Sequence, residues 1–116
     1  MAELVIIIRK PPYGSEDAFA LLNIALVAVS QNLSVAVILT GDGVYCGLRN
    51  QRSNTIGYPS VENLIYSFIA EVAFLACEES LKSRGIDEED LIEGMEVASH
   101  EKIAEVIESG ETIIAC

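Results

Sequence analysis

The sequence has few basic residues and a large excess of acidic ones. It holds 7 Lys and Arg against 18 Asp and Glu in 116 residues, a formal net charge of −11. Proteins that bind a phosphate backbone do so through clustered Lys and Arg. Here the basic residues are scattered, and the local pairs are Arg9 with Lys10 and Arg49 with Arg52. We therefore expect no direct contact with nucleic acid or with an anionic membrane.

Long apolar runs are also missing. No window approaches the ~18 uninterrupted apolar residues of a membrane-spanning helix, because Asn23 and Glu71 interrupt the best candidates. The first residues, from Met1 to Leu4, carry no basic segment, and the apolar run after them is too short for a signal peptide. These features predict a cytoplasmic protein.

Cysteine and histidine are too sparse for a disulfide framework or a metal cluster. The cysteines are Cys46, Cys77 and Cys116, an odd number without close spacing, and His100 is the single histidine. Reduced thiols are the better interpretation, and a structural zinc site lacks ligands. The phosphate-binding patterns GxGxxG and GxxxxGK[ST] are absent as well. We expect no metal ion and no cofactor.

The residues that are present predict a single domain, residues 1–116, in which strands and helices alternate. Apolar residues make up 51% of the chain. The predicted strands are Glu3–Arg9, Ser34–Leu39, Glu71–Ala76, Gly94–Ala98 and Thr112–Ala115, and the predicted helices are Glu16–Gln31, Val61–Ala70, Cys77–Arg84 and His100–Glu108. Parallel strands need crossover connections, so this alternation predicts an α/β fold with a mainly parallel sheet of about five strands and helices on both faces.

One of these assignments has an alternative. Glu71–Ala76 could instead prolong the preceding helix. We prefer a strand, because Cys77–Arg84 then becomes a short helix that Gly85 closes, as glycine often does at a helix C-terminus.

The connections are predicted from caps and turn residues. Ser15, Ser60 and Ser99 stand where helix N-caps are expected. The remaining expectations are a turn at Thr40–Gly43, helical turns at Val44–Leu48 and Asp87–Leu91, and a mobile polar loop at Arg49–Ser60.

In an open parallel sheet, ligands and reactive groups gather beyond the carboxyl ends of the strands. Three segments qualify here: Lys10–Ser15 after the first strand, Thr40–Gly43 after the second, and Cys77 after the third. We therefore expect these segments to meet at one edge.

Cys77 is the candidate catalytic residue. At a helix N-terminus, unpaired backbone N–H groups favour the thiolate, the form that attacks sulfur electrophiles. Glu78 and Glu79 oppose this effect, so we expect no strongly depressed pKa. The alternative is that Cys77 is a small buried apolar residue.

The other candidates carry weaker signals. Cys46 is either a second thiol at the same edge or a packed cysteine on a short turn. Cys116 lies at the end of a strand, where a reactive role is not indicated. His100 is expected to be a solvated surface residue rather than a catalytic base.

The order of three motifs resembles one known family. "KPPYGS" at Lys10–Ser15, "GDGVY" at Gly41–Tyr45 and "CEESLKSRGI" at Cys77–Ile86 are similar in sequence and spacing to the DsrE/DsrF/DsrH family of sulfur-relay proteins, which includes the Tus proteins of transfer-RNA thiolation. The "DGVY" segment followed by Gln51, and the brief connection after Gly85, resemble the DsrF/TusC type most.

The resemblance implies a three-layer α/β/α fold and assembly with homologous subunits into homo- or hetero-oligomers, commonly trimers or hexamers. It also implies a sulfur-relay function in which Cys77, eight residues before Gly85, carries sulfur as a persulfide between donor and acceptor proteins. Tyr13, Gly14 and Asp42 would then line the site, with Cys46 nearby.

Two other functions are left open by the sequence. One is a non-catalytic scaffold subunit of a hetero-oligomeric sulfurtransferase complex. The other is a small-molecule or anion-binding module built on the first two loops, which has a suitable position at the strand ends but no phosphate motif.

Overall fold

The computed structural model of the chain describes residues 2–13, 16–51 and 60–116. These residues form a five-stranded, wholly parallel sheet with the strand order β4-β3-β2-β1-β5. The predicted α/β fold with a parallel sheet is confirmed. The strands are β1 (Leu4–Ile8), β2 (Val35–Leu39), β3 (Ala73–Cys77), β4 (Glu96–Ala98) and β5 (Thr112–Ala115).

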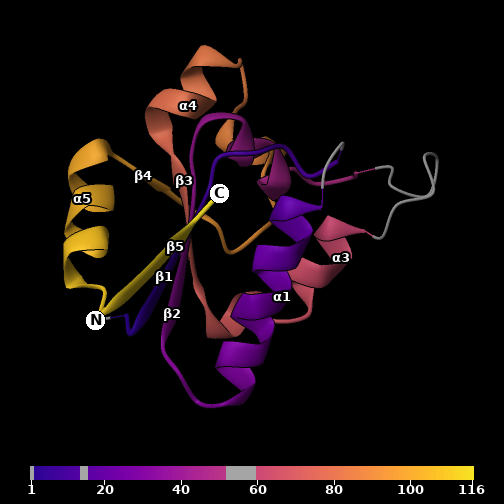
Figure 1. The fold of residues 1–116 in the computed structure, drawn as a ribbon. Coiled ribbons are helices and arrows are strands. Elements are labelled where there is room, and N and C mark those ends of the chain that lie inside the picture. The colour runs from indigo at the N-terminus through magenta and orange to yellow at the C-terminus, as the bar shows by residue number, and fades with distance from the viewer. Residues whose placement is uncertain (1, 14–15, 52–59) are drawn as a thin grey trace.

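Helices cover both faces of the sheet, so the fold has three layers (Figure 1). Helices α1 (Asp17–Ser30) and α3 (Val61–Tyr66) lie on one face, and α5 (His100–Ser109) lies on the other. Helix α4 (Glu78–Ser83) continues directly from the carboxyl end of β3. The 3-10 helices η1 (Gly41–Gly47), η2 (Ile69–Glu71) and η3 (Glu88–Asp90) occupy connections. In the described parts of the chain, no helix is both long and apolar enough to span a bilayer.

The strand side chains divide between two cores of unequal size, because successive residues of a strand point to opposite faces. The larger core lies under α1 and α3 and the smaller one under α5. Helix α5 covers its face with partly buried side chains, whereas five residues of α1 are buried. The smaller core contains Val5, Ile38, Leu75 and Ala98, with Ile103, Val106 and Ile107 of α5 packed against it.

The choice between helix and strand before Cys77 is settled by the sheet. Ala73–Cys77 forms β3, which pairs with β2 on one side and β4 on the other. The single helix predicted over Val61–Ala70 is wrong beyond Tyr66. Phe68 leaves helical geometry with a φ of −144°, which places its ring in the core 5.7 Å from that of Phe74. Burying this ring ends α3, and η2 follows.

The connections differ from prediction in their boundaries. Helix α1 has Glu16 as its N-cap, whereas Ser15, the predicted cap, lies outside the described residues. Of the loop predicted at Arg49–Ser60, residues 52–59 lie outside them as well. The turn predicted at Thr40–Gly43 and the helical turn after it merge into one element, η1. The helical turn predicted at Asp87–Leu91 is present as η3.

Candidate functional site

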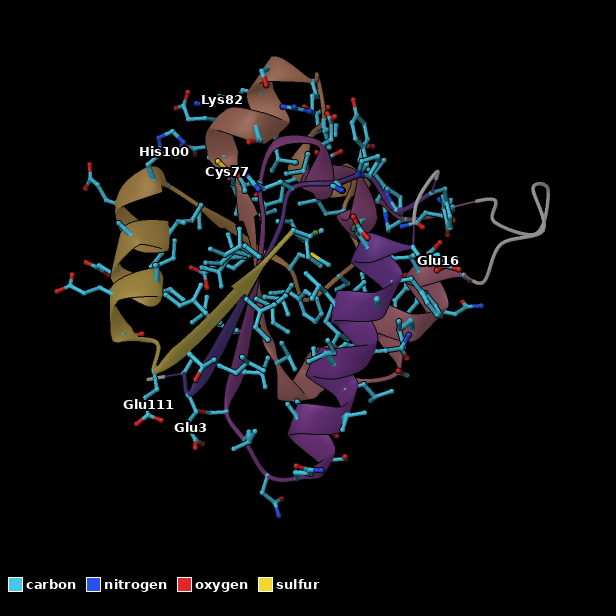
Figure 2. All side chains as sticks on the ribbon, in the orientation of Figure 1. Glu3, Glu16, Cys77, Lys82, His100 and Glu111 are labelled. Atoms are coloured by element: carbon cyan, nitrogen blue, oxygen red, sulfur yellow. The ribbon has the colours of Figure 1, made fainter. Side chains whose placement is uncertain are left out.

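Cys77 is the last residue of β3 and the N-cap of α4. It shares the sheet face of Leu75, two residues earlier, and therefore faces the layer of α5. The residue is only 1% exposed to solvent. Figure 2 shows it at the base of α4, close to the start of α5. The predicted position of Cys77 at a helix N-terminus is thus confirmed, although its thiol is covered in the isolated chain.

The surroundings of Cys77 favour the thiolate. Burial alone would raise the pKa of the thiol, but hydrogen bonds from the Ser80 side chain and backbone, and from the side chains of Thr40 and His100, lower it below the ordinary value of 9.0. A thiolate is stabilised by donors of this kind in the same way as a carboxylate. The acidic residues Glu78 and Glu79, expected to oppose this effect, do not outweigh the donors.

Ser80 is held in place from several directions. Its hydroxyl oxygen accepts a 2.9 Å hydrogen bond from the backbone N–H of Gly41 and lies 3.5 Å from the hydroxyl of Thr40. Its carbonyl accepts hydrogen bonds from Arg84 Nη1 and Ser83 Oγ, both at 3.1 Å. These contacts join the end of β2 to the first turn of α4, and they fix the Ser80 hydroxyl beside Cys77.

His100 reaches the same site from a third element. β4 pairs with β3 in a register that puts Ala98 opposite Cys77, and His100 follows two residues later as the first residue of α5. The Ser99 hydroxyl caps this helix by accepting the N–H of Lys102 at 3.2 Å. His100 is exposed, as the sequence predicts. It also lies beside the base of α4 near Cys77, which the sequence does not predict (Figure 2).

Asp42 is connected to α4 but not through Cys77. One of its carboxylate oxygens accepts hydrogen bonds from Arg84 Nε at 3.2 Å and Nη2 at 3.0 Å. Because Arg84 also binds the Ser80 carbonyl, Asp42 braces the helix that carries the site. Asp42 therefore supports α4 from outside the site. The sequence interpretation places it instead among the residues that line the site.

Tyr13 lies on the opposite side of the sheet. Its hydroxyl donates a 2.8 Å hydrogen bond to Gln51 Oε1 and accepts the N–H of Val61 at 3.1 Å. These contacts connect the segment after β1 to the start of α3, in the layer that faces away from Cys77. Gly14, expected to line the site with Tyr13, lies outside the described residues.

The other two thiols are placed apart from Cys77. Cys46 is fully buried in the larger core, where its thiol donates a weak 3.6 Å hydrogen bond to the Lys10 carbonyl. Burial raises the pKa of Cys46 to about 12, so this thiol is inert at neutral pH and does not provide a second reactive group. Cys116 ends the chain after β5, and its carbonyl accepts a 2.9 Å hydrogen bond from Arg9 Nε.

A metal centre has no geometric basis within residues 2–13, 16–51 and 60–116. No group of three or more His, Cys, Asp or Glu side chains in these ranges could hold an ion. The described site offers a covered thiol beside hydroxyl and imidazole donors, which lower its pKa and so favour the thiolate form.

Cys77 is thus buried at the point where β3 ends and α4 begins, in a five-stranded parallel sheet. A model of the DsrE/DsrF-like family matches residues 2–116. The chain belongs to this family. The resemblance drawn from "KPPYGS", "GDGVY" and "CEESLKSRGI" is thereby confirmed.

Several relatives in the DsrE/DsrF-like family match over nearly their whole length. An uncharacterized protein of Methanocaldococcus jannaschii is 34% identical over 113 residues, covering 96% of this chain and 97% of its own. Protein YchN of Escherichia coli is 30% identical over 116 residues, covering 98% of both chains. A TusC homolog of Vibrio parahaemolyticus is 28% identical over 118 residues, covering 99% of both.

The crystal structure of YchN superimposes on this chain with a TM-score of 0.91 at 28% sequence identity, covering all of both chains. This likeness agrees with the five-stranded parallel sheet and its helices. The family relationship implies an involvement in sulfur relay.

Sequence reasoning missed three of the residues that surround Cys77. Ser80 follows Cys77 by three residues, which is the position whose N–H an N-cap side chain reaches. Thr40 directly follows the neighbouring strand β2, and His100 begins the helix after β4, the strand on the other side. The spacing of Ser80 was a usable signal, whereas the proximity of Thr40 and His100 depends on the strand order and register, which a single sequence does not give.

Proposed function

We propose that this chain is a cytoplasmic sulfur-relay protein that accepts sulfane sulfur on Cys77 and passes it to the thiol of a partner protein. The observation that carries the proposal is the environment of Cys77, whose pKa lies below its ordinary value although the residue is 1% exposed. Free cysteines buried without a role are normally held as neutral thiols, as Cys46 is in the same chain.

The transfer is a thiol exchange in which no net oxidation occurs. The Cys77 thiolate attacks the terminal sulfur of a donor persulfide, the new S–S bond forms at Cys77, and the donor thiolate leaves. The terminal sulfur arrives with its proton as Cys77–S–SH, and loss of that proton leaves the resting persulfide with its negative charge on the terminal sulfur. An acceptor thiolate attacks the terminal sulfur of the protonated form, a new S–S bond forms at the acceptor, and the Cys77 thiolate is released.

Access to Cys77 requires a movement, because its side chain is covered. The exposed side of the site is formed by α4 and the start of α5, where His100 and Glu79 are exposed. We propose that donor and acceptor proteins approach over this side. They would displace the first turn of α4 or the His100 side chain from the thiol.

The test is the intact mass of the protein after incubation with a small-molecule persulfide donor and removal of excess reagent. Wild type and the matched control Cys116→Ser should each gain one sulfur, and Cys77→Ser should gain none. An equal gain by wild type and Cys77→Ser would refute the assignment.

The alternative is a non-catalytic scaffold subunit that completes an oligomer around a sulfur-carrying homologue. Two observations favour it: the covered thiol, and apolar side chains on the surface, with Ile24 of α1 43% exposed, Val27 of α1 55% exposed and Ile113 of β5 46% exposed. Contact with homologous subunits, in a trimer or a hexamer, would cover such side chains. Labelling of a purified complex separates the two functions, because a scaffold leaves only the partner subunit carrying sulfur.

A further inference from the structure

Two of the side chains that donate to Cys77, those of Ser80 and His100, come from different elements and differ in their exposure to solvent. Ser80 is partly buried in the first turn of α4 and is fixed through Gly41 and Arg84. His100 is exposed at the start of α5. One donor is therefore rigid and lies on the covered side of the site, whereas the other is free to move on the open side.

The hydrogen bonds of Ser80 determine where its proton goes. Its oxygen accepts the Gly41 N–H at 2.9 Å, so the hydroxyl hydrogen must point to another acceptor. The Thr40 oxygen lies 3.5 Å away, a long contact in which either hydroxyl can be the donor, and the Cys77 sulfur is a second acceptor for the Ser80 hydroxyl. A sulfur anion is the better acceptor, because hydrogen bonds to charged groups are stronger than those to neutral ones.

A persulfide changes where the negative charge lies. In the thiolate the charge is on Cys77 Sγ, whereas in the persulfide it is on the added sulfur, about 2 Å farther out along the new S–S bond. A donor fixed beside Sγ cannot follow this displacement. A donor on the open side of the site can, because an exposed histidine side chain keeps its rotamer freedom.

We propose that Ser80 and His100 are catalytic residues with separate roles: Ser80 donates a hydrogen bond to the Cys77 thiolate before loading and after release, and His100 donates to the terminal sulfur of the persulfide. Gly41 is a positioning residue that acts through Ser80, whereas the Thr40 hydroxyl lies against Ser80 and also donates to the Cys77 sulfur. This inference rests on the proposed function of Cys77 and assigns the groups that stabilise its two anionic states.

The first measurement concerns the thiolate and needs no sulfur donor. The ultraviolet absorbance of the thiolate is measured as the difference from Cys77→Ser at a fixed pH below the titration midpoint. Ser80→Ala should lower the thiolate fraction about tenfold, the equivalent of one hydrogen bond to a charged group. Ser80→Thr, which keeps the hydroxyl, should retain most of it. Ser30→Ala, which removes an exposed hydroxyl at the end of α1, is the matched control and should match wild type.

The second measurement concerns the persulfide. The protein is first incubated with limiting persulfide donor, and the yield of loaded Cys77 is measured by intact mass. A small-molecule thiol is then added as acceptor, and the loss of sulfur is followed in the same way. His100→Ala should lower the yield of loaded Cys77 about tenfold at limiting donor, whereas His100→Gln, which keeps an N–H donor, should restore much of it. Glu101→Gln serves as the control on α5. Circular dichroism confirms that each variant is folded.

The outcomes separate this inference from the proposed function. Unchanged thiolate in Ser80→Ala, or unchanged loading in His100→Ala, overturns the corresponding role. If wild type takes up no sulfur, the proposed function is wrong and the role of His100 falls with it, while the thiolate measurement still decides whether Ser80 binds the sulfur anion.

Discussion

Gly43→Ala should destabilise the fold strongly, because Gly43 lies against the backbone at the end of β1. A Cβ atom at this position would overlap the carbonyl oxygen and carbon of Ile8 and come within 3.2 Å of the Cα of Arg9. Backbone atoms of a central strand cannot turn aside as a flexible side chain does. The change therefore forces η1 away from the sheet.

The expected cost follows from two contributions. Overpacking of this kind costs about 1–3 kcal/mol. Moving η1 also endangers the 3.1 Å hydrogen bond from the Thr40 N–H to the Ile8 carbonyl, worth about 1 kcal/mol. The free energy of unfolding should therefore fall by about 2–4 kcal/mol. Because Thr40 and Gly41 hold Ser80, the thiolate fraction of Cys77 should fall as well.

Gly85→Ala is the matched control for this prediction. Gly85 has a φ of +65° but open space around it, so that a Cβ atom added there would meet no atom within 4 Å. Its replacement should cost about 1 kcal/mol, since left-handed strain is partly offset by a less flexible unfolded chain. Urea denaturation of both variants measures the difference. A cost for Gly43→Ala no larger than that for Gly85→Ala would refute the argument from close packing.

Three further predictions concern charges and thiols. Cys46 should resist alkylation in the folded protein at neutral pH and react once the chain is unfolded in urea, because its pKa is about 12 and its side chain is fully buried. A double-mutant cycle on Asp42 and Arg84 should give a coupling of about 0.5–1 kcal/mol, since their side chains are 58% and 25% exposed; a coupling of zero would remove the bracing role. The pKa of Cys77 is lower in the folded protein than its ordinary 9.0, so the stability of wild type relative to Cys77→Ser should rise with pH between the folded value and 9.0 and be level below it. A relative stability that falls over this window would contradict the stabilised thiolate.

The strands could be predicted because each one is a short apolar run between turn residues. For β3 the sequence also allows a longer preceding helix. The strand is favoured because a short helix after Cys77 can then end at Gly85, a residue type common at helix C-termini. The end of α3 could not be predicted in the same way. Phe68 leaves the helix because its ring packs against Phe74 in the core. A single sequence does not show which residues pack together in this way.

The sequence predicts the position of Cys77 but not the residues that surround it. Cys77 at the start of α4 followed from the alternation of strand and helix. The expected neighbours Tyr13 and Asp42 are engaged elsewhere, because the segment after β1 turns toward α3 and Asp42 turns toward Arg84. The donors come instead from the ends of adjacent elements, and their meeting depends on strand order.

Sulfur uptake by Cys77 alone is the most direct test of the central claim. In the Cys46→Ser, Cys116→Ser double variant, Cys77 is the single remaining cysteine of the chain. After incubation with a persulfide donor, this variant should gain one sulfur by intact mass and lose it to an acceptor thiol. A folded double variant that gains no sulfur, alone or in complex with a homologous subunit, would contradict the account and leave the scaffold role.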